Sequence, residues 1–151
     1  MKEILIAMAS VMASVPLLTG CGRTENKSIL PAASTHSLEP IPLSGEGRHN
    51  PLPAGGYFTW RFDQKPQIGG LIVILQAYSQ DGRKESPYEI SGEYGMPGMR
   101  AHDSGPVPFQ MNQKGDYLLP VEIAMPGAWQ ITLRIKRDGK QILVGKISFE
   151  V

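Results

Sequence analysis

Residues 129–151, WQITLRIKRDGKQILVGKISFEV, decide the fold. Apolar and polar residues alternate through the first half of this stretch, which gives a strand one buried side and one solvent-facing side. The pair Asp138-Gly139 then supplies the positive φ angles that a type I′ turn requires. Alternation resumes after the turn, from Leu143 to the end of the stretch. The stretch therefore predicts a β-hairpin of two long strands.

Further segments upstream also have strand character. Residues 57–63 alternate strictly, which predicts a strand with one buried face. Residues 71–78 form an apolar run, which we interpret as a central strand covered on both sides. Residues 117–124 alternate as well, and Pro120 lacks the N–H that a neighbouring strand would use, so we expect an edge or a bulge there. Two weaker strands are expected at residues 87–93 and 107–111.

Together these segments predict an all-β domain. About seven strands, separated by turn signals, are typical of an immunoglobulin-like β-sandwich. No segment has a convincing helical period. Because the chain has a single cysteine, no disulfide is expected to reinforce the domain.

The N-terminal residues resemble a bacterial lipoprotein signal. Lys2 precedes an apolar segment, residues 4–18, that is shorter than the roughly 20 residues a membrane-spanning helix needs. The segment ends in Leu18-Thr19-Gly20-Cys21, which resembles a lipobox, in which the cysteine is acylated and becomes the new N-terminus. We therefore predict a signal peptide over residues 1–20 and lipidation of Cys21. The alternative is an ordinary secretory signal with an incidental cysteine.

The predicted lipid anchor places the protein in the cell envelope, on the extracytoplasmic side of a bacterial membrane. By resemblance to lipoprotein sorting signals, Gly22, in place of Asp, favours the outer membrane and a periplasmic location in a cell with two membranes. Residues 21–50 are rich in Ser, Pro, Gly, Thr and Asn, so we expect a lipidated N-terminus and a flexible linker that leaves His36 and His49 in solvent. The folded domain is then expected to occupy residues 51–151.

Charge and motifs exclude several classes of function. Lys and Arg number 15 and Asp and Glu 14, and the basic residues are scattered, so we expect no nucleic-acid partner. The sequence contains no nucleophile elbow, no His-Glu-x-x-His and no phosphate-binding glycine loop. Asp63, Asp103 and Asp116 are single carboxylates beside turns, where they usually accept hydrogen bonds from backbone amides. The chain is therefore not expected to be an enzyme.

A methionine-rich loop is the best candidate site. Met96, Met99 and His102 are spaced three residues apart in a loop bounded by Gly and Pro, and Met111 follows. Thioether sulfur is a soft ligand that prefers Cu(I), and imidazole accepts either copper state. We therefore predict a copper site formed by Met96, Met99, His102 and Met111. The alternative is that the methionines fill gaps in the core, which is the interpretation we favour for Met125 and Trp129.

Three stretches also carry a family resemblance: YGMPGMRAH (94–102), GDY (115–117) and IAMPGAWQI (123–131). They resemble the YtkA-like domain, a small bacterial β-sandwich related to FixH-like proteins, and the resemblance covers about residues 57–151. In that family a Met-Pro-x-Met stretch precedes a Gly-x-Tyr strand and a Met-x-Gly-x-Trp strand start, and Met96 and Met99 match it directly. The resemblance implies copper handling or cytochrome-oxidase assembly.

Two functions from different classes follow. The leading hypothesis is a lipid-anchored extracytoplasmic β-sandwich that binds or relays copper and meets a metal-transfer partner. The alternative is a non-catalytic cell-envelope interaction module that binds a protein partner through a loop or an edge strand and needs no metal.

Overall fold

The computed structural model describes residues 38–53, 55–85, 87–99 and 103–151, and these residues form two β-sheets without a helix. Sheet A has the strand order β1 (Ile41–Pro42), β11 (Lys140–Glu150), β10 (Ala128–Arg137), β6 (Tyr88–Gly95) and β7 (Val107–Pro108). Sheet B has the order β2 (Asn50–Pro51), β3 (Tyr57–Phe62), β4 (Gly69–Tyr78), β9 (Tyr117–Ile123) and β8 (Gln110–Met111), and β5 (Lys84–Glu85) pairs with β4.

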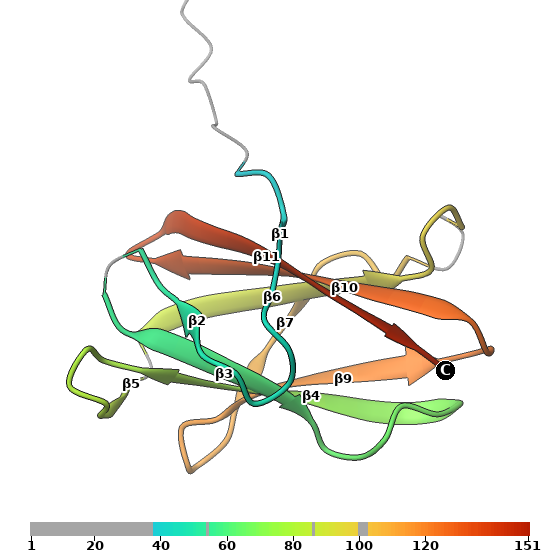
Figure 1. Ribbon diagram of the computed structural model, residues 1–151, viewed down its shortest axis with the longest axis horizontal. Helices are drawn as coiled ribbons and strands as arrows, with labels where there is room; N and C mark the ends of the chain where they lie inside the picture. The colour runs from blue at the N-terminus through green and yellow to red at the C-terminus, as the bar shows by residue number, and fades with distance from the viewer. Residues whose placement is uncertain (1–37, 54, 86, 100–102) are drawn as a thin grey trace, which may run out of the picture. The chain divides into compact units, whose positions relative to one another are not determined.

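Figure 1 shows the two sheets as an upper layer that contains β6, β10 and β11 and a lower layer that contains β3, β4 and β9. The predicted all-β sandwich is confirmed. Its long strands are β3, β4, β6, β9, β10 and β11, and each of the others is two residues long. No helix in the part of the chain that the structure describes could cross a membrane.

The C-terminal hairpin forms as the sequence predicts. β10 and β11 pair antiparallel from Ala128↔Glu150 to Arg137↔Lys140, and the turn between them has Asp138 at φ 53° and Gly139 at φ 73°. Two consecutive positive φ angles are those of a type I′ turn. One extra residue in β11 shifts the register between Ile135 and Lys136, which is a local bulge.

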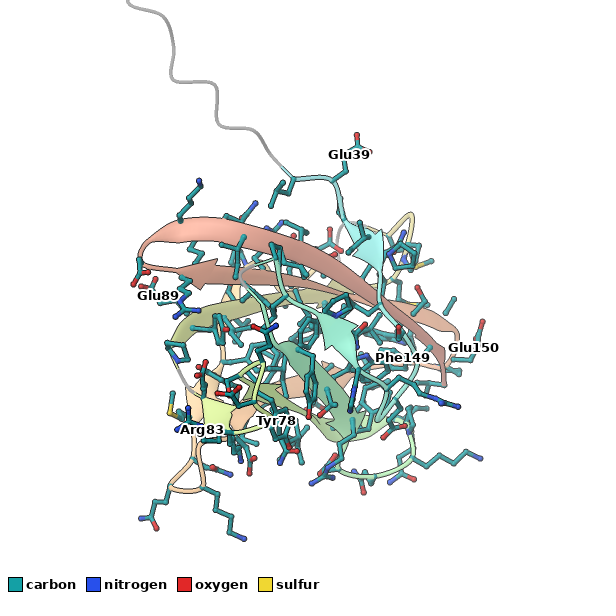
Figure 2. The ribbon with its side chains drawn as sticks, turned by 60° about the vertical axis from the view of Figure 1, so that its left-hand side comes forward. Glu39, Tyr78, Arg83, Glu89, Phe149 and Glu150 are labelled. Carbon is teal, nitrogen blue, oxygen red and sulfur yellow. The ribbon has the colours of Figure 1, made fainter. Side chains whose placement is uncertain are left out.

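The core lies between the inward faces of the two sheets. Phe58, Leu75, Leu119, Ile131 and Leu133 are fully buried there, and together with their neighbours they form one continuous apolar cluster. Aromatic contacts join the layers at one side, where Phe149 of β11 (labelled in Figure 2) meets Phe62 of β3 edge to face at 5.0 Å between ring centroids. Burial of this cluster supplies most of the stability, because each large apolar side chain contributes about 1.5–3 kcal/mol.

The central strand β4 is buried on one face only. Leu71 and Val73 face the core and are almost fully buried, whereas Ile72 is 37 % exposed on the outer side of sheet B. The prediction that this strand is covered on both sides is therefore wrong. The reason is that the described chain places no second layer on the outer face of sheet B, although that face carries isoleucines.

The segment expected to be one strand at residues 107–111 crosses from one sheet to the other. Its first part, β7, pairs with β6 in sheet A, and its last part, β8, pairs with β9 in sheet B. Phe109 lies between them, and its N–H donates to the carbonyl of Ile90 at 2.8 Å. Since β8 reaches only Tyr117 and Leu118, β9 is an edge from Leu119 onward, which confirms the edge expected at Pro120.

The fold begins earlier than predicted, because residues from Ile41 onward belong to the sandwich. β1 adds to sheet A as a parallel strand beside β11, and the Leu43 N–H donates to the Lys146 carbonyl at 2.9 Å. The Leu43 side chain lies where a Cβ on Gly145 would stand, so the missing side chain at Gly145 makes room for it. The predicted linker boundary at residue 50 is therefore wrong.

Residues after Leu43 form hydrogen bonds along the free edge of β3. The Trp60 indole donates to the Ser44 carbonyl at 2.8 Å, and the Phe62 N–H donates to the Glu46 carboxylate at 2.8 Å. Asn50 is 3 % exposed, and its side-chain oxygen accepts from the Ser44 N–H at 2.7 Å. The Pro- and Gly-rich composition is typical of a linker, but here it forms turns whose polar groups satisfy the edge of sheet B. Cys21 and His36 lie outside the described residues.

Candidate functional site

The methionine turn, residues 96–99, follows directly from its sequence. The Met99 N–H donates to the Met96 carbonyl at 3.0 Å, and Gly98 has a φ of 86°. Proline in the second position and glycine with positive φ in the third are the signature of a type II β-turn. Met96 and Met99 form an antiparallel bridge across the turn. Their side chains therefore leave the backbone on the same side, with Cβ atoms about 5 Å apart.

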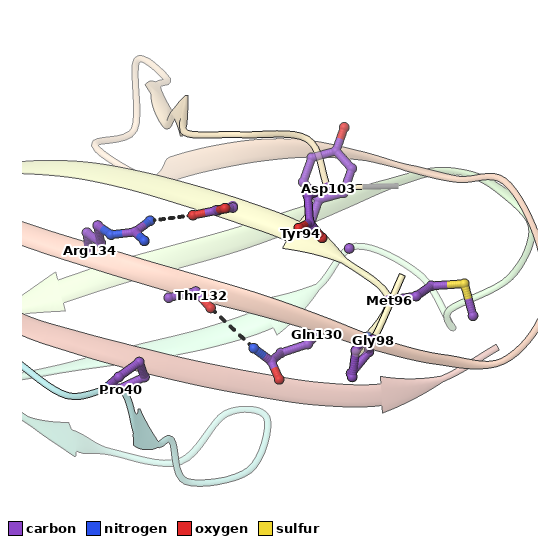
Figure 3. A pocket seen from close by; sticks show the side chains of 11 residues that line it. Pro40, Tyr94, Met96, Gly98, Asp103, Gln130, Thr132 and Arg134 are labelled. Atoms are coloured by element: carbon purple, nitrogen blue, oxygen red, sulfur yellow. Dashed lines mark hydrogen bonds and ion pairs between the residues drawn. The ribbon is translucent and has the colours of Figure 1, made fainter. Parts of the chain in front are cut away.

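The two methionines differ in their surroundings. Met96 is partly buried and packs against the core, and a Cβ on Gly127 would lie 2.8 Å from its methyl carbon. Figure 3 shows its side chain directed away from Gln130 and Thr132. Met99 is 50 % exposed. One thioether is thus held against the β9–β10 loop, and the other is accessible to an ion or molecule in solvent.

Of the remaining predicted ligands, His102 lies outside the described residues, and Met111 lies at the opposite end of the sandwich. Met111 pairs with Tyr117, the first residue of β9, whereas Met96 contacts the loop that follows Ile123, the last. Strand β9 separates these ends by about 20 Å at 3.3 Å per residue. The structure therefore does not bring Met111, which is 50 % exposed, to the methionine turn.

Residues 103 and 104, which follow the methionine turn, pack against the end of β6. Tyr94 and Ser104 exchange two hydrogen bonds, from the Ser104 N–H to the Tyr94 carbonyl at 2.9 Å and from the Tyr94 N–H to the Ser104 hydroxyl at 3.0 Å. The Asp103 carboxylate lies against Gly95, where a Cβ on that glycine would overlap it. The exposed carboxylate of Asp103 thus stands beside the turn at a position that sequence spacing does not predict.

A pocket of about 360 Å³ with mixed polar and apolar walls adjoins the turn on the outer face of sheet A (Figure 3). Within it Arg134 pairs with Glu93 at 2.9 Å, and the Gln130 amide donates to the Thr132 hydroxyl at 3.4 Å. The alternation in β10 predicts that Gln130, Thr132 and Arg134 point outward. The sequence pattern could not show that β6 and Pro40 complete a pocket with them, because these segments are far apart in the sequence.

Trp129 does not cover this site. It is 2 % exposed, and its indole donates to the Met125 carbonyl at 3.1 Å, so the core interpretation of Trp129 is confirmed. Met125 is partly buried and packs against the same core. No group of three or more His, Cys, Asp and Glu side chains that could hold a metal ion occurs among the residues described. Among the described residues at this end, the thioethers of Met96 and Met99 are soft donors.

A second polar cluster, at the opposite end, is structural. The Asp116 carboxylate is buried and accepts hydrogen bonds from side chains on three segments: Lys84, Asn112 at 2.9 Å and Gln76 at 2.7 Å. Burial alone would raise the pKa of Asp116, but these donors and the charge of Lys84 outweigh it and lower the pKa to about 2. Asp63 has the expected local role, since its carboxylate accepts from the Ile72 N–H at 2.8 Å.

The chain matches no family model, no curated protein and no solved structure. Its resemblance to the YtkA-like domain therefore stays a prediction from the residues quoted above.

Proposed function

We propose that this chain is a lipid-anchored protein of the bacterial cell envelope that binds Cu(I) through Met96 and Met99 and passes it to a partner, in metal homeostasis or cytochrome-oxidase assembly. The antiparallel bridge across the methionine turn is the observation that supports this best. It directs two soft ligands to the same side of one hydrogen-bonded turn.

The unequal burial of the two thioethers suits transfer of an ion. Met96 is fixed by its packing against the core, so its sulfur has little freedom to lose when an ion binds. Met99 is half exposed and is the ligand that an arriving ion would meet first. Two protein thioethers leave coordination positions of Cu(I) open to a ligand from a partner. We propose His102 as a third ligand and leave Met111 out because of its distance.

The lipid anchor is part of the same proposal. Cys21 closes the predicted lipobox and is the only cysteine, which agrees with a thiol used for acylation. An anchored domain stays near membrane proteins that receive metal. Methionine also suits an oxidising compartment, because it does not form disulfides. The YtkA-like resemblance supports the same setting.

A competitive Cu(I) titration tests the metal site. The fragment should begin at His36, because residues from Ile41 onward complete the sheets and residues 36–151 form one compact unit. We expect one Cu(I) per chain, and we expect the double variant Met96→Leu/Met99→Leu to lose it while keeping side-chain volume. Met111→Leu is the matched control and should bind like the parent. Equal affinity in parent and double variant would refute the copper site.

The second candidate function is an interaction module without metal. The exposed Ile72 and the half-buried Ile74 on the outer face of sheet B favour it, since apolar groups that no layer of the described chain covers mark a contact surface. Addition of a partner strand to the free edge of β9 is disfavoured, because Pro120 lacks an N–H there. If the titration finds no copper, this module becomes the working hypothesis.

A further inference from the structure

The outer face of sheet B has an apolar centre. Ile72 lies opposite Pro120, and Ile74 lies opposite Leu118, in neighbouring rows of the β4–β9 ladder. Alternation places these four side chains on the solvent side, because Leu71, Val73 and Leu119 between them face the core. Ile72 and Pro120 are exposed, and Ile74 and Leu118 are half buried.

Charges of opposite sign lie on either side of this centre. Two acidic residues lie toward one end. Asp63 donates its N–H to the Ile72 carbonyl, and Glu122 lies opposite Gly70. Toward the other end are Arg61, which lies opposite Ile74, and Lys114 in the turn before β9. All four charged residues are exposed, and none has an ion-pair partner in the part of the chain described.

We propose that this face binds a second copy of the chain. The twofold axis lies in the plane of the interface, perpendicular to the strands, between the rows of Ile72 and Ile74. Rotation about it reverses the strand direction and places each strand against the same strand of the second copy. Asp63, level with Ile72, then faces Arg61 of the second copy, which is level with Ile74.

The same axis matches the second pair of charges. Glu122 lies one row beyond Ile72, and it meets the row one step beyond Ile74 in the second copy. That row holds Gln76 and, opposite it, Asp116, whose carboxylate is buried and paired with Lys84. Lys114 borders the same row, since its carbonyl accepts from Lys84, and it carries the exposed charge there. The exposed charge that Glu122 approaches in the second copy is therefore that of Lys114. Both acidic residues meet basic ones, and the apolar rows meet each other.

Self-complementarity favours a second copy over another partner. A different protein would need the same two signs of charge at the same spacing, whereas a second copy supplies them by symmetry. The strands β3, β4 and β9 contribute 6, 10 and 7 residues, which at about 3.3 Å per residue and about 4.8 Å between strands cover about 360 Å² per copy. This is less than half of the ~800 Å² per partner of a typical stable interface, so we expect a weak dimer with a Kd of roughly 100 μM or more. The dimer does not depend on the proposed copper site.

Sedimentation of the fragment 36–151 over a range of concentrations tests the dimer. Lys114→Glu or Glu122→Lys places like charges opposite each other at two symmetric positions, so each variant should weaken the dimer about tenfold. The double variant Lys114→Glu/Glu122→Lys exchanges the pair and should restore it. Lys140→Glu, at the start of β11 in sheet A, is the control. It changes the net charge of the fragment by the same amount as Lys114→Glu and should leave the Kd of the dimer unchanged.

Cross-linking gives a second readout that does not depend on charge. The fragment has no cysteine, so Ile72→Cys introduces one thiol near the axis, within reach of a short bismaleimide in the dimer. Thr132→Cys on the outer face of sheet A is the control and should stay uncross-linked. A fragment that remains monomeric up to millimolar concentration, a double charge variant that does not recover, or equal cross-linking at both positions would overturn the proposal.

Discussion

Replacement of Asp116 by Asn should remove a pH-dependent part of the stability. The carboxylate receives three side-chain donors, one of them the Lys84 ammonium, which ties β5 to the turn before β9. The pKa of Asp116 is lowered to about 2 from an ordinary value of 3.8. A group whose pKa is depressed by folding stabilises the folded state above its unfolded pKa, and this contribution is lost as the pH falls toward the folded pKa.

The difference in pKa sets the magnitude. At 1.36 kcal/mol per unit, a depression of roughly two units contributes about 2 kcal/mol at neutral pH. Most of it should be lost between about pH 5 and pH 2. The carboxylate is buried, so solvent screens this contribution less than it would at an exposed pair. Asp116→Asn abolishes the titration, and its free energy of unfolding should fall less over this pH range than that of the parent by about 2 kcal/mol.

Urea unfolding of the fragment 36–151 at several pH values measures this difference. Asp81→Asn is the matched control: the pair of Asp81 and Arg83 is exposed, with side chains 74 % and 81 % accessible, so its profile should follow the parent. Carboxyl ¹³C shifts report the titration of Asp116 directly. Parallel stability profiles for parent and Asp116→Asn, or a carboxyl that titrates near 4, would show that the three donors do not hold this charge.

Three further predictions concern the anchor and the loops. Cys21→Ser should abolish incorporation of labelled palmitate and release the protein from the membrane fraction, and labelling that persists would rule out lipidation at this residue. Gly127→Ala should destabilise the domain by about 1–3 kcal/mol in thermal unfolding and weaken Cu(I) binding, because Gly127 has a φ of 133° and a Cβ there would press on the Met96 methyl. Trp129→Phe keeps most of the buried ring but loses the hydrogen bond to the Met125 carbonyl, so it should lower the free energy of unfolding by about 1–2 kcal/mol while copper affinity stays unchanged; an affinity that falls would place the indole at the metal after all.

Local sequence patterns were sufficient to predict the structure wherever it is determined by residues that are neighbours along the chain. The turn at Asp138-Gly139 and the alternation on either side of it define a complete hairpin, and both are visible in the sequence. Pro120 indicated an edge, because the missing N–H is a property of the residue itself. The type II turn at Pro97-Gly98 likewise follows from its two central residues.

Features that depend on distant partners could not be predicted in this way. The apolar run at residues 71–78 gives no sign of whether a layer covers the side that carries Ile72, and in the described chain none does. Residues 41–50 look like linker by composition, but they pair with β11 and seal β3 through single hydrogen bonds. Met111 joined the predicted ligand set by nearness in sequence, although a crossing between sheets carries it to the far end.

The proposed copper site and the proposed dimer face can coexist because they use different parts of the fold. The methionine turn lies at the end of the sandwich where β9 finishes, and its contacts are with β6 and the β9–β10 loop. The proposed interface uses the outer face of sheet B, and an axis across the strands sends the two methionine turns to opposite ends of the dimer. Each copy would therefore keep its own Met96 and Met99. At a concentration at which the parent is largely dimeric, the Kd for Cu(I) should then be the same in the parent and in the Lys114→Glu variant, whose dimer is weaker. A difference between them would mean that the two surfaces are coupled.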